Sequence, residues 1–105
     1  MEKTFTYNGK TYTLTYTLDS VRKMDERGFV LDEVRTNPAT AVPVLFSGAL
    51  IEKHKNLKQT EIQEIYQALP KKDVLISVLI EMYTDTVSQL LDEPEEGNAV
   101  TEISW

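Results

Sequence analysis

Polar and apolar side chains alternate along the first part of the chain, from Lys3 to Thr17, with one interruption. A period of two is typical of β-strands that have one covered face. The interruption is Asn8-Gly9, a pair that favours a two-residue type I′ turn because both of its residues need a positive φ. The pattern therefore predicts a β-hairpin over residues 3–17. The expected cross-strand pairs are Tyr7 with Lys10, Phe5 with Tyr12, and Lys3 with Leu14.

The same alternation assigns the side chains of this hairpin to two different faces. The apolar face carries Phe5, Tyr7, Tyr12, Leu14 and Tyr16. The other face carries Thr4, Thr6, Thr11, Thr13, Thr15 and Thr17. Because a two-stranded hairpin is barely stable alone, the apolar face is expected to pack on helices. The threonine face is left for solvent or for a partner, and solvent exposure is the simpler expectation.

After the hairpin, the spacing of apolar residues changes to about 3.6, which predicts helices. The expected helices cover residues 19–27, 41–53, 61–69 and 73–91. Asp19-Ser20 can cap the first helix, and Gly28 suits its C′ position. Thr60 and Gln63 have the spacing of a capping box for the third helix. Pro43 is expected in the first turn of the second helix, where its missing N–H has no partner to lose.

The last of these helices has the widest apolar face and is expected to be the central core helix. Ile76 and Ile80 extend this face, whose main stripe comprises Val74, Leu75, Val78, Leu79, Met82, Tyr83, Thr86, Val87, Leu90 and Leu91. The sequence thus predicts one α+β domain over residues 1–91, an N-terminal β-hairpin packed on a small bundle of four to five helices. Residues 92–105 are expected to be a flexible acidic C-terminal tail, because residues 92–98 offer nothing to bury.

Composition and charge narrow the function classes. The chain has no cysteine, which excludes a disulfide scaffold, a zinc–thiolate site and a thiol nucleophile. The tail carries five acidic residues and no basic residue. The rest of the chain carries the other 12 of the 17 acidic residues and all 11 basic residues, so it is nearly neutral. Nucleic-acid binding needs a basic stripe, and the sequence has none. No secretory signal or membrane span is expected either, so the predicted location is cytoplasmic, with no nucleic-acid or membrane partner.

Residues that carry catalysis are scarce. His54 is the single histidine, and it lies among charged residues at an expected helix end, where a cation is mildly favourable. The adjacent acids Asp25-Glu26 and Asp32-Glu33 do not face one another on a helix and lack the spacing of a calcium loop. The four glycines stand apart, so no phosphate-binding loop is present. A hydrolase with paired carboxylates stays open, but no pair lies in an apolar context. We expect no enzyme, and no catalytic, cofactor-binding or metal-binding residue.

The expected helix 41–53 offers a candidate partner-binding surface. Its apolar side chains recur at three and four residues, the spacing of one helix face. They are Val42, Leu45, Phe46, Ala49 and Leu50. The small residues Ser47-Gly48-Ala49 would let another backbone approach closely. Two interpretations remain: the face binds a partner, or it belongs to the core, which is the simpler reading for any single apolar residue.

Several stretches, taken in order, resemble one known family. They are the hairpin around Asn8-Gly9-Lys10, Val21-Arg-Lys-Met-Asp-Glu-Arg-Gly-Phe-Val-Leu-Asp32, Pro43-Val-Leu-Phe-Ser-Gly-Ala49, Ile62-Gln-Glu-Ile-Tyr66, and Leu90-Leu-Asp-Glu-Pro94 with the acidic tail ending in Trp105. In this order the chain resembles the tail assembly chaperones of long-tailed bacteriophages and prophages, in their small Gram-positive form. The resemblance covers essentially the whole chain.

This resemblance implies a non-enzymatic assembly factor in the host cytoplasm. Such a chaperone binds the tape measure protein and keeps it soluble during tail tube assembly, and it is absent from the mature virion. A longer frameshifted product would engage the tail tube protein, and a homo-oligomer is expected. Two alternatives stay open: a small phage adaptor or regulatory protein that binds one defined partner, and a tail completion or connector protein that stays in the particle.

Overall fold

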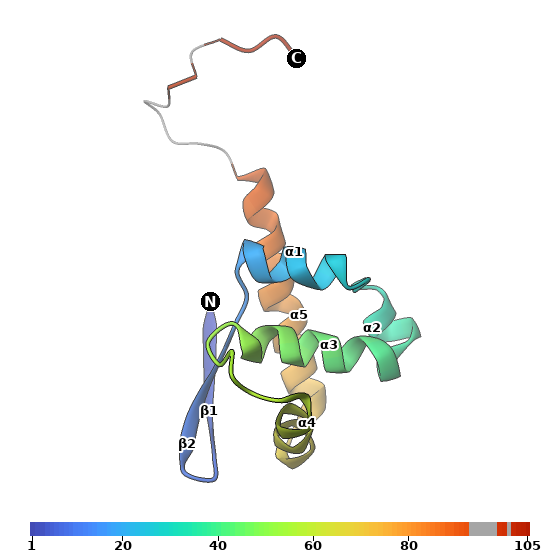
Figure 1. The fold of residues 1–105 in the computed structure, drawn as a ribbon. Helices are drawn as coiled ribbons and strands as arrows, with labels where there is room; N and C mark the ends of the chain where they lie inside the picture. Colours follow the sequence, from blue (N-terminus) through green and yellow to red (C-terminus); the bar gives the residue numbers. More distant parts are fainter. Residues whose placement is uncertain (93–98, 101) are drawn as a thin grey trace.

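A two-stranded antiparallel hairpin precedes five α-helices and one short 3-10 helix in the computed structural model, which describes residues 1–92, 99–100 and 102–105 (Figure 1). The elements are β1 (Glu2–Tyr7), β2 (Lys10–Thr15), α1 (Leu18–Glu26), α2 (Glu33–Thr36), α3 (Pro38–Ile51), α4 (Gln59–Ala68), α5 (Lys72–Ser88) and η1 (Gln89–Leu91). The predicted α+β fold is confirmed. Part of the predicted tail, residues 93–98 and 101, lies outside the described residues.

The hairpin has the predicted register, with all three expected cross-strand pairs. Asn8 and Gly9 both have positive φ, 49° and 77°, as the turn requires. Its apolar face packs on the helices as expected. The threonine face is largely exposed, but Thr15 is buried, and its Oγ1 donates a hydrogen bond to the carbonyl of Met1 at 3.0 Å. The base of that face is therefore covered, which the alternation alone did not predict.

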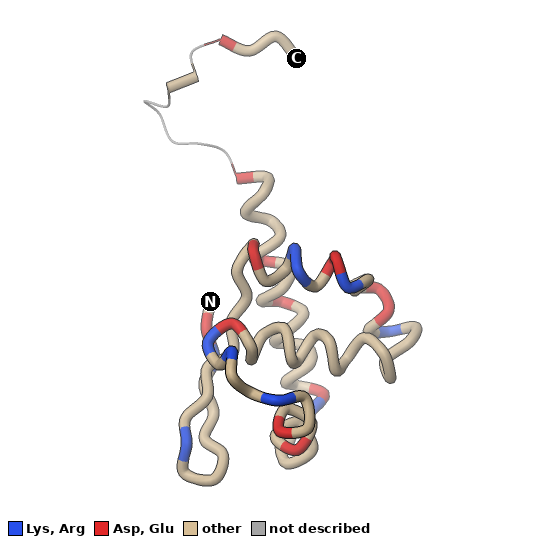
Figure 2. The backbone as a smooth tube through the Cα atoms, viewed as in Figure 1, with Lys and Arg blue, Asp and Glu red and all other residues tan. Residues whose placement is uncertain are grey.

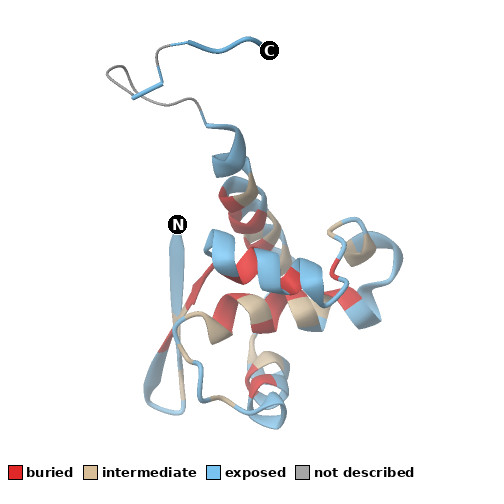
Figure 3. Cartoon of the chain, turned by 45° about the horizontal axis from the view of Figure 1, so that its top comes forward, coloured by how far each residue is buried: buried red, intermediate tan, exposed pale blue. Residues whose placement is uncertain are grey.

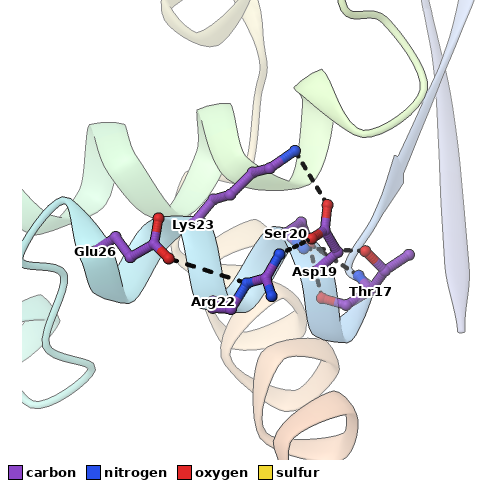
Figure 4. Close-up of polar contacts among 6 residues, drawn as sticks. All are labelled: Thr17, Asp19, Ser20, Arg22, Lys23 and Glu26. Atoms are coloured by element: carbon purple, nitrogen blue, oxygen red, sulfur yellow. Dashed lines mark hydrogen bonds and ion pairs between the residues drawn. The ribbon is translucent and has the colours of Figure 1, made fainter.

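The helix caps differ from the expected ones. Thr17, not Asp19 or Ser20, is the N-cap of α1: its Oγ1 accepts from the Ser20 N–H at 3.1 Å, and Ser20 Oγ accepts from the Thr17 N–H at 2.9 Å (Figure 4). Gly28 follows α1 with a φ of +87°, as expected for C′. The box expected from Thr60 and Gln63 is also wrong, because α4 begins earlier.

α4 begins at Gln59, and Lys58 is its N-cap. The Lys58 N–H donates a hydrogen bond to a carboxylate oxygen of Glu61 at 3.1 Å. α3 begins at Pro38, and Pro43 lies inside the helix, not in its first turn. Pro43 cannot donate to the carbonyl of Ala39, which is exposed, so water can take the place of that hydrogen bond. The short helix α2 was not expected.

The core lies where α5 crosses α1 and α3, and both β2 and α4 pack against α3 (Figures 1 and 3). Leu79, Met82 and Tyr83 of α5 are buried there. α1 and α3 approach each other closely at Gly48, which has no side chain: a Cβ at this position would lie 2.5 Å from Met24 Sδ. The small stretch in α3 thus serves the packing of helix on helix.

Candidate protein-binding surface

The predicted partner-binding face of α3 is part of the core. Leu45, Phe46, Ala49 and Leu50 are at most 1% exposed, and Val42 is half-buried. Tyr16 Oη donates to the Leu45 carbonyl at 2.6 Å, and the Phe46 ring lies 5.1 Å from that of Tyr66. Because α1, α4, α5 and β2 cover these side chains, they offer nothing to a partner, and the hypothesis of a binding face there is wrong.

The exposed apolar surface lies on α5 and η1 instead. Residues Lys72–Leu91 are long and apolar enough to cross a membrane by length and composition, and 22% of that window is buried in the fold. The same helix supplies Leu79, Met82 and Tyr83 to the core and packs on α1 and α3. Apolar side chains at both ends of this helical stretch remain exposed: Val74 is 55%, Leu90 69% and Leu91 86% exposed.

At the C-terminal end of α5, this surface becomes a groove. It lies between α1 and η1, has a volume of about 400 Å³, and is lined by Leu18, Asp19, Val21, Arg22, Asp25 and Leu90. Leu18 is 38% exposed and Leu90 is 69% exposed, while Val21 is buried at the base. We call this feature the α1–η1 groove. It is partly open to solvent and apolar at its centre, which suits side chains of a protein partner.

Charged side chains form ion pairs along α1, beside the α1–η1 groove (Figure 4 shows the pairs). Asp19 pairs with Lys23 at 3.0 Å and with Arg22, which also approaches Glu26 at 4.0 Å. The hydrogen bond and charge of Lys23 hold the pKa of Asp19 below its ordinary value. All these side chains are exposed, so the pairs contribute little stability. Of the charged side chains, Asp19, Arg22 and Asp25 line the groove and give it a polar rim around an apolar centre, the usual composition of a protein interface.

Two smaller cavities also lie on the helical body. One, of about 190 Å³, lies between α3 and α4, and the other, of about 220 Å³, lies between α1 and α3. Both are below the size of a typical small-molecule site. No group of three or more histidine, cysteine, aspartate or glutamate side chains that could hold a metal is found among the residues that the structure describes. That the protein is not an enzyme stays a prediction.

One family model, described as "Domain of unknown function (DUF5055)", matches residues 1–105. The chain belongs to the DUF5055 family. No curated protein and no solved structure matches the chain. The function of this DUF5055 chain therefore has to be argued from its own surface.

His54 has a different role from the expected one at a helix end. It lies beyond the end of α3, is half-buried, and its Nε2 accepts a hydrogen bond from the Thr13 N–H at 3.0 Å. The imidazole ring also lies 5.1 Å from the Tyr12 ring. His54 thus joins the free edge of β2 to the segment after α3, as a neutral acceptor and not as an exposed cation.

Replacing His54 by alanine is expected to lower the free energy of unfolding by about 1 kcal/mol, because the Thr13 N–H loses its acceptor. Burial, and after it the charge of Lys10, lowers the pKa of His54 below its ordinary value of 6.5. The stabilisation is therefore present above about pH 6.5 and is lost as the pH falls through the lower folded-state pKa. Urea unfolding at pH 7.5 and pH 5 measures both effects. An alanine variant with the same pH dependence as the natural chain would contradict this role.

Proposed function

We propose that this chain is a phage tail assembly chaperone that binds the tape measure protein in the host cytoplasm, without catalysis. The observation that carries the proposal is the α1–η1 groove, in which Leu18 and Leu90 are exposed around a buried apolar base. The resemblance of the whole chain to such chaperones supports the same reading. The proposed client surface differs from the α3 face expected from the sequence.

The shape of this groove suits an amphipathic helix. A client helix presents apolar side chains at three and four residues, and a shallow apolar groove accepts a few of them at a time. A single groove of about 400 Å³ binds such a helix weakly. A long client with many repeats of this pattern can hold many chaperone copies, and linked contacts gain strength together. Coverage of the client's apolar stripe then keeps it soluble.

Co-expression with the tape measure protein of the same phage or prophage tests the proposal. We expect the two proteins to co-purify, and we expect Leu90→Asp to weaken capture at least about tenfold, because a charge would enter the apolar centre of the groove. Val74→Asp is the matched control: Val74 is also exposed on the apolar helix, but it lies 16 residues away, about 24 Å along a helix.

Circular dichroism should show both variants folded, since both side chains are largely exposed. Equal capture by the Leu90→Asp variant and the natural chain would reject the groove as the client site. Failure of the natural chain to co-purify would reject the proposed function itself. Purified particles should lack the chain, whereas a tail completion or connector protein would remain in them.

A further inference from the structure

An acidic, aromatic segment near the end of the described chain plays no part in the α1–η1 groove. Trp105, the single tryptophan, is 98% exposed, and Ile103 is largely exposed as well. Five acids and no base lie between Asp92 and Trp105, with Glu102 the nearest of them to the tryptophan. A tryptophan side chain buries about 150–250 Å² when it is covered, so its exposure leaves a large apolar surface in water.

The cavity between α1 and α3 has the opposite character. Its base is apolar, formed by Met24, Gly48 and Ile51. Gly48 has no side chain, so Met24 packs directly against the backbone of α3, where a Cβ would lie 2.5 Å from Met24 Sδ. We call this cavity the α1–α3 pocket. Its volume of about 220 Å³ suits one large side chain better than a small-molecule ligand.

Basic side chains surround the α1–α3 pocket. Lys23, Arg27 and Lys55 line it together with one acid, Glu52. Figure 2 shows basic positions on α1 and in the segment after α3. Lys23 pairs with Asp19, whereas Arg27 and Lys55 form no ion pair among the residues that the structure describes. The rim therefore carries positive charge that is available to an acidic partner.

The other two cavities lack this complementarity. The α1–η1 groove is lined by two acids and one base, and the cavity between α3 and α4 is lined by no charged side chain. An acidic segment with an aromatic anchor thus matches the α1–α3 pocket best. We propose that Trp105 of one copy of this chain inserts into the α1–α3 pocket of a second copy, with Glu102 beside the basic rim.

In the single chain Trp105 is 98% exposed, so its apolar surface is left for a second copy to cover. The contact joins two different surfaces and is therefore heterologous. In a dimer, one copy still has a free Trp105 segment and the other still has a free α1–α3 pocket. Repetition gives an open head-to-tail array or a closed ring. This inference concerns self-association and stands or falls separately from the client groove.

Fluorescence of the single tryptophan tests the contact directly in the full chain. As the concentration rises from about 1 to 100 μM, we expect the emission of Trp105 to shift to shorter wavelength and acrylamide to quench it less. Raising the salt from about 50 to 500 mM should reverse the change, because the rim contacts are between charges near the surface. Sedimentation over the same range should show association in parallel.

Two matched variants separate the pocket from overall charge. Arg27→Glu with Lys55→Glu should raise the concentration needed for association at least about tenfold. Lys3→Glu with Lys58→Glu changes the net charge equally at exposed sites that do not line the pocket and should leave association unchanged. Trp105→Ala should remove association while circular dichroism stays native. Mixing the Arg27→Glu, Lys55→Glu variant with a Glu102→Lys variant should partly restore association, because the new lysine can pair with the acidic rim of the variant pocket.

Three results would overturn the inference. A short-wavelength emission that does not depend on concentration would mean that the chain covers its own tryptophan. Full quenching of Trp105 at about 100 μM would mean that nothing covers it. Unchanged association of the Trp105→Ala variant would mean that another surface joins the copies. Each result leaves the client groove untouched, since its readout is capture of the tape measure protein.

Discussion

Replacing Phe46 by aspartate is expected to unfold the chain. Phe46 is 1% exposed, and its ring packs against Tyr66 of α4. Truncating a buried phenylalanine costs about 3–5 kcal/mol, and a charge left in the core without a partner adds to that. Domains of this size have about 5–15 kcal/mol of stability in all, so the change removes most or all of it. Leu50→Asp, at an equally buried position of α3, should behave in the same way.

Thermal unfolding followed by circular dichroism measures this effect. Leu91→Asp is the control, because Leu91 is 86% exposed and the same charge there remains in water. We expect the Leu91→Asp chain to melt within a few degrees of the natural chain and the Phe46→Asp chain to show no cooperative transition. A folded Phe46→Asp chain with a native melting temperature would contradict the position of Phe46 in the core.

The hairpin could be predicted almost completely from the sequence because its signals are local. A period of two fixes which side chains share a face, and Asn8-Gly9 fixes the turn and with it the register. The burial of Thr15 could not be predicted in this way. It depends on the chain before β1, whose Met1 carbonyl accepts a hydrogen bond from Thr15. Alternation describes faces, not what the rest of the chain brings to them.

The helices were found by their period, but their ends and environments were not. Thr17, Asp19 and Ser20 lie close together in the sequence, and each of these residue types can cap a helix, so the sequence alone does not distinguish among them. An apolar stripe such as that around Phe46 looks the same in a core and on a binding face. Only the contacts with α4, α5 and β2 distinguish the two cases.

The α1–η1 groove depends on residues that are distant in the sequence. Leu18 and Leu90 lie 72 positions apart, and no local pattern joins them. One signal was nevertheless present, because the last predicted helix has apolar residues on more than one face. A helix of this kind needs either more neighbours than a chain of 105 residues supplies or a partner.

High pH is expected to destabilise the chain through two buried tyrosines. Burial raises the pKa of Tyr83 to about 12, and the charge of Asp25 and its hydrogen bond with Tyr83 Oη at 3.3 Å act in the same direction. Burial also raises the pKa of Tyr16, whose Oη donates to the Leu45 carbonyl and whose ring contacts Tyr83 edge to face. Both pKa values are higher in the folded chain than the ordinary value of 10. The stability they contribute is therefore fully present below pH 10 and is lost as the pH rises through the folded-state values.

Urea unfolding at pH 9, 10, 11 and 11.5 measures this loss. A difference of two pH units corresponds to about 2–3 kcal/mol for Tyr83 alone, a large part of the stability of a small domain. Lysine side chains also lose their charge in this pH range. The effect of Tyr83 is therefore measured as the difference in stability between the natural chain and a variant without its hydroxyl. Tyr83→Phe keeps the ring that packs on Tyr16 and Phe29 and removes the group that titrates. Its stability should fall less steeply above pH 10, and an identical slope in the natural chain and this variant would show that the Tyr83 hydroxyl is not held protonated by the fold.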